Sequence, residues 1–527
     1  MSISKILENS VHMETTLLNS ETDALISFTD ADRSTSSFTS STNLQAKPQK
    51  KPMPILPTIG AITFGIVYML PIMTSHPAAH STFAVLCLAA FLWGTEAIPA
   101  YATSYLVPLF SVWFGVGLND LTKLRYESAS LATRFASKFM DPVIFVFLGS
   151  MTMSDCLSKL NITDRVSGFV FHRLSKRPAY ILLVLMLLNL FIGAFLSNVA
   201  STTLVLTFTM PIIRSLDPDD PFIKALLLGI GWSGNCAGMP TTIASPQNIM
   251  ALDCLKKYNS KISFLQWIYF ALPTSLIICV LEWLYLILRF KSNSDVIIIP
   301  EPTTQYPPWS YKHTFASVVT LITILLWTLE DQLGKVLGAM GITSLIPVIC
   351  FFGSGIMTVV DFHTIRWSTL ALMGGGLCLG EAMTCSGLLS LVNDFAGPTL
   401  SKISLWPLLI IFLVFEGLLG SLINSTSAAS ILYPLIAELG KGTHHPMQMV
   451  ILSALMISGA QLFHISSFPN ALVSGVCKHQ FGNPEKVSQK TFLQGNDFPI
   501  LGWPTMIMSV LSIASIGYGI TKAISVD

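Results

Sequence analysis

A polar cluster at Ser197 and Asn198 interrupts a long apolar stretch of the sequence. The stretch runs from Tyr180 to Ile213, which is longer than the roughly 20 residues that one membrane-crossing helix needs. A helix that is broken at the polar cluster explains both the length and the polarity. Such a break exposes backbone N–H and C=O groups, which are tolerated at membrane depth only beside a cavity. The sequence therefore predicts a cavity at Ser197 and Asn198.

A second cluster, Asn424-Ser425-Thr426, interrupts the apolar run 405–439 in the same way. The amides freed at the start of each second half-helix can bind an anion, because the helix dipole places positive charge there. The freed carbonyls, with Ser and Asn oxygens, can coordinate a cation. The alternative is that these side chains only form hydrogen bonds between neighbouring helices. Two breaks at corresponding places favour a midplane binding site, as in transporters with discontinuous helices.

Two further segments, 238–248 and 464–470, are rich in oxygen donors and helix breakers. Ser245 and Asn248 lie in the first segment, and Ser467 and Asn470 lie in the second. Hard cations prefer oxygen ligands, so these turns suit Na⁺. Ordinary proline turns at helix starts are the alternative. From these segments alone, the ordinary turn is the favoured interpretation.

The composition places these clusters in a membrane protein. Of the 527 residues, 52% are hydrophobic and 11% are charged, and the net charge is +1. These values exclude a cytosolic enzyme, a secreted disulfide scaffold and a basic nucleic-acid-binding protein. We expect an all-α polytopic protein that is not an enzyme. About eleven transmembrane helices are predicted, at 55–73, 82–99, 101–118, 180–213, 222–252, 264–290, 313–329, 336–357, 405–439, 446–476 and 499–524.

Two other apolar stretches, 142–160 and 368–391, carry glycine near the middle and an acidic residue beyond it. We interpret them as re-entrant hairpins. The acidic residues are Asp155 and Glu381, and ionisable groups at membrane depth are candidates for a functional role. If they instead lie in water at the open ends of the hairpins, they have no such role.

The chain repeats itself at a nearly constant offset. Gly149 and Gly375 are 226 residues apart, as are Asn198 and Asn424, and the Asn248 turn recurs slightly earlier at Asn470. Three landmarks in one order predict two repeated halves, 51–291 and 313–527. A proline-containing linker, 292–312, joins them. Residues 1–50 are rich in Ser and Thr and show no apolar period, so we expect a disordered tail.

These landmarks resemble the divalent anion–sodium symporter family, and most closely the low-affinity phosphate transporters of fungi. The similarity covers about residues 55–524 and rests on four segments. They are Glu96-Ala-Ile-Pro99, Leu196-Ser197-Asn198-Val199-Ala200, Ser245-Pro246-Gln247-Asn248-Ile249 and Gly517-Tyr518-Gly519-Ile520. The resemblance implies an inverted repeat, a scaffold domain, a mobile transport domain that moves as an elevator, and a homodimer.

The resemblance also implies the site residues. The substrate-binding residues would be Asn198, Val199, Asn424, Ser425 and Thr426. Na⁺ would be held by Ser197, Asn198, Gly149, Ser245, Asn248, Asn424, Gly375, Ser467 and Asn470.

Three departures from the family pattern bear on the substrate. Val199 and Ile423 stand where carboxylate carriers usually have hydroxyl side chains, which disfavours a di- or tricarboxylate. The tail of about 50 residues cannot be the SPX domain that fungal phosphate transporters usually carry.

We therefore expect a secondary active transporter of an inorganic anion, phosphate first, coupled to Na⁺ or H⁺, in the plasma membrane or a vacuolar-type internal membrane. The site would hold little fixed positive charge, with neutral Asn, Ser, Thr and amide groups facing the anion in place of Arg or Lys. Sulfate or a di/tricarboxylate is the alternative substrate. An anion channel and a transport-dead nutrient sensor are alternatives from other classes. Besides the ions that cross the membrane, no cofactor is expected, and neither is a nucleic-acid partner.

Overall fold

The computed structural model describes residues 55–118, 125–165, 176–257, 262–293, 296–297, 308–338, 340–400, 402–442, 445–476 and 492–523. Within these ranges the regular elements are helices, and the only β pairing is an isolated bridge between Leu118 and Arg125. The all-α prediction is confirmed for this part of the chain. The predicted tail, 1–50, and most of the predicted linker, 292–312, lie outside the described residues.

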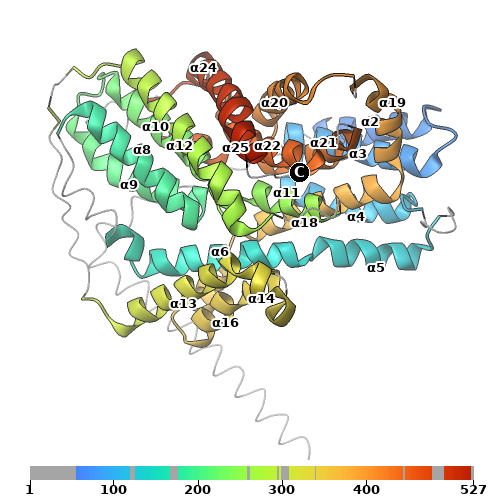
Figure 1. Ribbon diagram of the computed structural model, residues 1–527, viewed down its shortest axis with the longest axis horizontal. Coiled ribbons are helices and arrows are strands. Elements are labelled where there is room, and N and C mark those ends of the chain that lie inside the picture. Colours follow the sequence, from blue (N-terminus) through green and yellow to red (C-terminus); the bar gives the residue numbers. More distant parts are fainter. Residues whose placement is uncertain are drawn as a thin grey trace, which may run out of the picture. The chain divides into compact units, whose positions relative to one another are not determined.

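The first half contains ten helices among the described residues (Figure 1). They are α2 (Ile55–Met69), α3 (Pro77–Thr95), α4 (Ala100–Trp113), α5 (Ser128–Phe139), α6 (Pro142–Lys159), α8 (Pro178–Phe195), α9 (Asn198–Ser215), α10 (Phe222–Ala237), α11 (Pro246–Lys256) and α12 (Phe264–Arg289). Helix starts follow local capping rules. Pro142 begins α6 after Asp141, whose carboxylate accepts the Val143 amide, and Ser263 and Gln266 form a capping box at α12.

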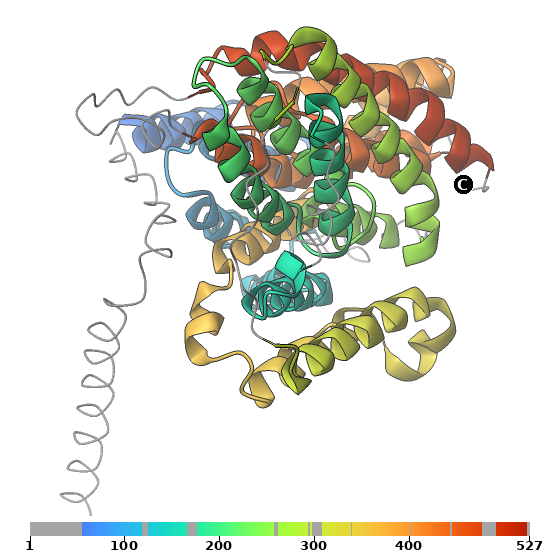
Figure 2. The same cartoon turned by 90° about the vertical axis from the view of Figure 1, so that its left-hand side faces the viewer.

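The second half is built from a corresponding series of helices. They are α13 (Tyr311–Thr328), α14 (Glu330–Leu337), α15 (Met340–Thr343), α16 (Leu345–Gly353), α17 (Val359–Thr364), α18 (Trp367–Cys385), α19 (Leu388–Leu400), α20 (Leu405–Leu422), α21 (Ser425–Gly442), α22 (Pro446–Gly459), α23 (Phe468–Ser474) and α24 (Asp497–Ser512), followed by the π-helical segment η2 (Ile513–Gly517) and α25 (Tyr518–Ala523). In both views α6 lies between α13–α16 on one side and α11 and α18 on the other (Figures 1 and 2).

Six helical spans among the described residues are long and apolar enough to cross a membrane, or seven if the bent pair α18–α19 counts as one. The predicted number of about eleven is not confirmed, because several predicted spans consist of two shorter helices. The run 180–213 is α8 and α9, and the run 405–439 is α20 and α21. Each predicted break therefore coincides with the start of a new helix, at Asn198 and at Ser425.

The two halves use the same order of contacts around these breaks. Helix α8 packs on α10 as α20 packs on α22, and α10 and α22 are each followed by a short helix that starts with a proline turn. The deepest side chains, such as Trp232 and Trp267, lie in this region and are fully buried. The repeated elements thus surround one core.

The hairpin predicted for 142–160 is wrong, because this stretch is the single continuous helix α6. Gly149 lies inside it, where an added Cβ would come 2.2 Å from the carbonyl oxygen of Ser344. The glycine therefore allows close contact between helices and makes no turn.

In the stretch 368–391 the chain does bend, but at a different place from the one predicted. The stretch consists of α18 and the start of α19, which meet at a bend of 69°. The bend lies next to Gly387, which has φ +78°. Gly375 lies inside α18 instead, where an added Cβ would come 2.4 Å from the Cβ of Ser104 on α4. A bent pair of this kind is either a broken span or a re-entrant loop.

Candidate functional site

A cavity of about 270 Å³ lies where the broken helices of the two halves meet. The first turns of four helices are part of its lining. They are represented by Ser197, Asn198 and Val199 at α9, Pro246 and Gln247 at α11, Arg366, Ser368 and Thr369 at α18, and Asn424, Ser425 and Thr426 at α21. Helix N-termini carry unpaired amides and positive dipole charge, so the cavity concentrates the features that bind anions.

The breaks are held in place by local hydrogen bonds. The backbone amide of Asn198 donates to the carbonyl of Ala244 at 3.2 Å, which joins the first break to the loop before α11. At the second break, the side-chain oxygen of Asn424 accepts the amide of Thr426 at 3.0 Å. These contacts fix both helix starts beside the cavity.

The structure brings most of the predicted residues together. Those that line the cavity are Ser197, Asn198, Val199, Asn424, Ser425, Thr426 and Ser467. Ser245, Asn248 and Asn470 belong to the turns directly beside it. Gly149 and Gly375 are not among the lining residues, since they lie inside α6 and α18 against other helices.

The two proline turns are built alike. Asn248 donates from its amide nitrogen to the carbonyls of Gly238 and Thr241, both at 2.7 Å. Asn470 donates to the carbonyls of Gln461 and Phe463 at 3.4 and 3.3 Å.

The side-chain oxygens of these two asparagines differ. Oδ1 of Asn470 accepts a hydrogen bond from Asn235 at 3.1 Å. Oδ1 of Asn248 is buried and has no partner among the described residues. A buried oxygen without a donor fits a cation ligand. The first turn therefore has a free ligand atom that the second turn lacks.

Arg366 is the principal residue that the sequence interpretation missed. It directly precedes α18, and among the described residues that line the cavity it alone carries a formal charge. Its Nη2 atom is buried and has no hydrogen-bond partner among those residues. The expectation of a site without Arg or Lys thus did not include a charged residue that lines this cavity. The signal in the sequence was a single arginine directly before an apolar run.

An ion pair fixes the segment before Arg366. Lys159, at the end of α6, lies 2.6 Å from Asp361 of α17. Partial burial alone would raise the pKa of Asp361, but hydrogen bonds from Lys159 and Thr358 outweigh it and lower the pKa below its ordinary value. Asp361 is therefore ionised at neutral pH and ties α17 to α6.

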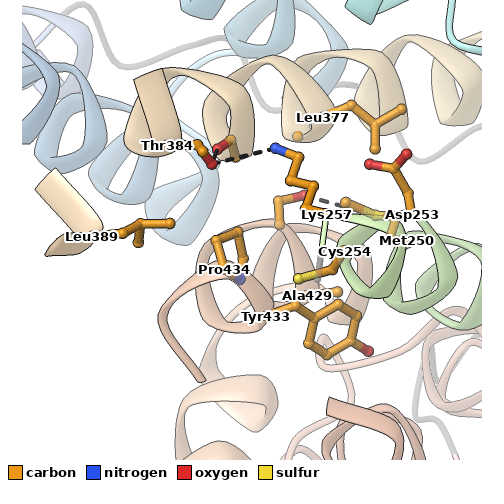
Figure 3. Close-up of a pocket in the computed structure, with 13 residues that line it drawn as sticks. Met250, Asp253, Cys254, Lys257, Leu377, Thr384, Leu389, Ala429, Tyr433 and Pro434 are labelled. Atoms are coloured by element: carbon orange, nitrogen blue, oxygen red, sulfur yellow. Dashed lines mark hydrogen bonds between the residues drawn. The ribbon is translucent and has the colours of Figure 1, made fainter. Parts of the chain in front are cut away.

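A second, much smaller cavity of about 30 Å³ lies between α11, α18 and α21 (Figure 3). Lys257 reaches toward Thr384, to which it donates at 3.3 Å, and it also pairs with Glu381 at 3.0 Å. Glu381 is paired with Arg134 as well, at 2.6 Å. The charged side chains here pair with one another, and the space holds at most a few water molecules. The larger cavity is therefore the candidate site.

Comparison with known proteins gives the family. Residues 69–456 match the family described as citrate transporter. The chain belongs to the citrate transporter family. The match includes both helix breaks and Arg366 and ends before Ser467 and Asn470. As a member of this family the chain is an integral, multi-pass membrane protein of a transporter class, in agreement with the expectation that it is not an enzyme.

Several relatives of this chain are named as anion transporters. It is 30% identical to the inorganic phosphate transporter PHO87 and 31% identical to the low-affinity phosphate transporter PHO90, both of Saccharomyces cerevisiae. The alignments cover 88% and 86% of this chain and 50% and 51% of those proteins, so the chain spans about half of their length. It is 24% identical to the sodium-dependent dicarboxylate transporter SdcS of Staphylococcus saprophyticus, over 82% of this chain and 88% of that protein.

A solved structure has a similar fold. The YdaH transporter of Alcanivorax borkumensis matches with a TM-score of 0.52 and 13% identity, over 81% of this chain and 99% of that one. At this identity the likeness concerns the fold alone.

Proposed function

We propose that this chain is a secondary active transporter that moves inorganic phosphate together with Na⁺. The observation that carries the proposal is the cavity lined by the first turns of α9, α11, α18 and α21 and by Arg366. Amide dipoles and one positive charge favour an anion over a neutral or cationic substrate. Asn198, Asn424, Ser425 and Thr426 would donate hydrogen bonds to its oxygens, and Val199 would line the cavity without a polar contact.

Phosphate is favoured by the relatives and by the lining. Two relatives with about 30% identity are named phosphate transporters. Val199 presents no hydroxyl to the cavity, which reduces the hydrogen-bond donors that a second carboxylate would need. A dicarboxylate is the second candidate, because 270 Å³ exceeds the space that one phosphate fills and because SdcS is named a dicarboxylate transporter.

Na⁺ is the proposed coupling ion, with H⁺ as the alternative. The free Oδ1 of Asn248 supplies a hard oxygen ligand beside the first helix break, close to Ser197, Asn198 and Ser245. A second cation would bind near Asn424, Ser467 and Asn470. Two relatives are described as sodium-dependent, which supports this choice. Gly149 and Gly375 are left out of the proposal, since both lie inside helices.

The transport movement is proposed as an elevator in a homodimer, which follows from the family resemblance. The helices α8–α11 and α20–α23, which hold the cavity between them, would belong to the moving domain. Because the cavity is enclosed mainly by these elements, it could travel with them as one unit.

Uptake by proteoliposomes tests the proposal. The purified chain is reconstituted, and entry of labelled phosphate, sulfate and citrate is measured with an inward Na⁺ gradient, with K⁺ in its place, and with a pH gradient. We expect phosphate uptake that requires Na⁺ and accumulates against a gradient. Cation-independent flux that only dissipates gradients would indicate a channel. Uptake of citrate or sulfate without phosphate would overturn the substrate assignment.

A further inference from the structure

Arg366 lines the cavity, and among the described residues the Nη2 atom of its guanidinium has no hydrogen-bond acceptor. This atom is buried, and Arg366 is the one charged residue among the described residues that line the cavity. Arginine carries five N–H donors and cannot lose its proton in a protein. A buried charge of this kind is costly unless an opposite charge or a set of acceptors comes close.

One acidic residue, on α6, has an electrostatic effect on this charge. Among the described residues, Asp155 of α6 is the carboxylate that interacts electrostatically with Arg366. The two form no ion pair, so the compensation is partial. Phe147 and Met151 of α6 line the cavity, and Asp155 follows Met151 by one helical turn, on the same face of the helix.

The position of Arg366 relative to α6 is fixed by its neighbours. The Lys159–Asp361 ion pair ties α17, which directly precedes Arg366, to the end of α6. Asp155 lies four residues before Lys159 on α6. This contact holds α17, and with it the segment that leads to Arg366, beside the end of α6.

We propose that Arg366 contacts the transported anion and that Asp155 is the counter-charge that holds this guanidinium while the cavity is empty. Nη2 is covered while the cavity is empty, so the Arg366 side chain would turn toward an oxyanion such as phosphate. The anion would then supply the missing acceptor, in the one- or two-pronged geometry that arginine forms with phosphate and carboxylate oxygens. Asp155 then competes with the anion for the same positive charge. It keeps anion binding weak enough for release, and it acts through Arg366 as a positioning residue. This inference rests on the proposed function, since it assumes that the cavity takes an anion.

Direct binding measurements test the inference. Phosphate, sulfate and citrate are titrated calorimetrically in Na⁺ buffer into the purified full chain and into Arg366→Gln, Arg366→Lys, Asp155→Asn and the double variant Asp155→Asn/Arg366→Gln. Arg289→Gln is the matched control, because Arg289 is an exposed arginine at the end of α12, against the Phe290 ring. We expect Arg366→Gln to raise the Kd about tenfold or more, as for the loss of a charge-assisted hydrogen bond. Arg366→Lys, which keeps the charge, should raise it less.

The expected result for Asp155 has the opposite sign. Asp155→Asn should lower the Kd about threefold by freeing the guanidinium, and this gain should vanish in the Arg366→Gln background. If either residue had only a structural role, its substitution would not lower the Kd for the anion. If Arg366→Gln elutes as aggregate, Arg366→Lys and Asp155→Asn carry the test.

The outcomes separate the inference from the proposed function. An unchanged Kd in Arg366→Gln relative to Arg289→Gln, or a tightening by Asp155→Asn that persists without Arg366, overturns the inference. If phosphate gives no saturable signal while sulfate or citrate does, the phosphate assignment fails and the variants are judged with that anion. If none of the three binds the unmodified chain, both proposals fail.

Discussion

The side chain of Asn235 donates a hydrogen bond of 3.0 Å to the side-chain oxygen of Gln461, and the two residues are 226 positions apart in the chain. The same offset carries Asn198 onto Asn424. Two residues separated by the offset that relates the two helix breaks therefore touch beside the cavity, which Asn235 lines. From here the hydrogen bonds continue to Asn470 on one side and, through Gln461, to the buried carboxylate of Glu282 on the other.

Loss of the Asn235–Gln461 hydrogen bond should destabilise the protein, and the effects of substituting the two residues should not be additive. Asn235→Leu and Gln461→Met should each lower the free energy of unfolding by about 1–3 kcal/mol, because each leaves buried polar partners unpaired. The loss in the double variant should be smaller than the sum of the two, since the residues share one network. Thermal unfolding in detergent measures this, with Gln332→Met on exposed α14 as the control. Strict additivity would contradict a shared network.

Gly375 of α18 should be needed for helix packing, and Na⁺ binding should not depend on it. Gly375→Ala would place a Cβ 2.4 Å from that of Ser104, so we expect a loss of about 1–3 kcal/mol from forced separation of α18 and α4. Gly65→Ala in α2 is the matched control, because no atom lies within 4 Å of its added Cβ. Thermal unfolding should distinguish the two variants. A normal melting temperature with altered Na⁺ dependence would instead place Gly375 in a cation site.

The two proline turns should differ in their effect on cation coupling. Asn248→Ala removes the unpartnered Oδ1, so the Na⁺ concentration for half-maximal phosphate uptake should rise about tenfold or more. Asn470→Ala removes an oxygen that already accepts a hydrogen bond from Asn235 and should shift that concentration less. Uptake by proteoliposomes at graded Na⁺ compares them. Equal shifts in both variants would mean that the turns bind Na⁺ alike.

The helix breaks could be predicted because a polar cluster inside an apolar run has few explanations at membrane depth. Asn198 and Asn424 are both recognisable in this way. In the structure, both lie at the starts of helices that line one cavity. Glycine is more ambiguous. The signals at Gly149 and Gly375 fit a turn or a close helix contact equally well, and only the positions of Ser344 and Ser104, distant in sequence, decide between them.

Arg366 and Glu282 could not be placed from the sequence, because their surroundings are made by distant segments. Arg366 reaches the cavity through the packing of α18 and α6, which no local pattern records. Glu282 occurs in an apolar helix and is fully buried against Gln461, which lies in the other half of the chain. The low fraction of charged residues in the composition thus did not exclude a charged residue in the cavity lining.

The central claim is that the two broken helices form one anion site. Na⁺-driven uptake of labelled phosphate into proteoliposomes tests it most directly, with Asn198→Ala and Asn424→Ala compared with Asn393→Ala on α19, outside the cavity lining. All variants are matched for the amount of correctly folded protein incorporated. We predict that either cavity variant abolishes uptake while Asn393→Ala retains it. Undiminished uptake by both Asn198→Ala and Asn424→Ala would contradict the account.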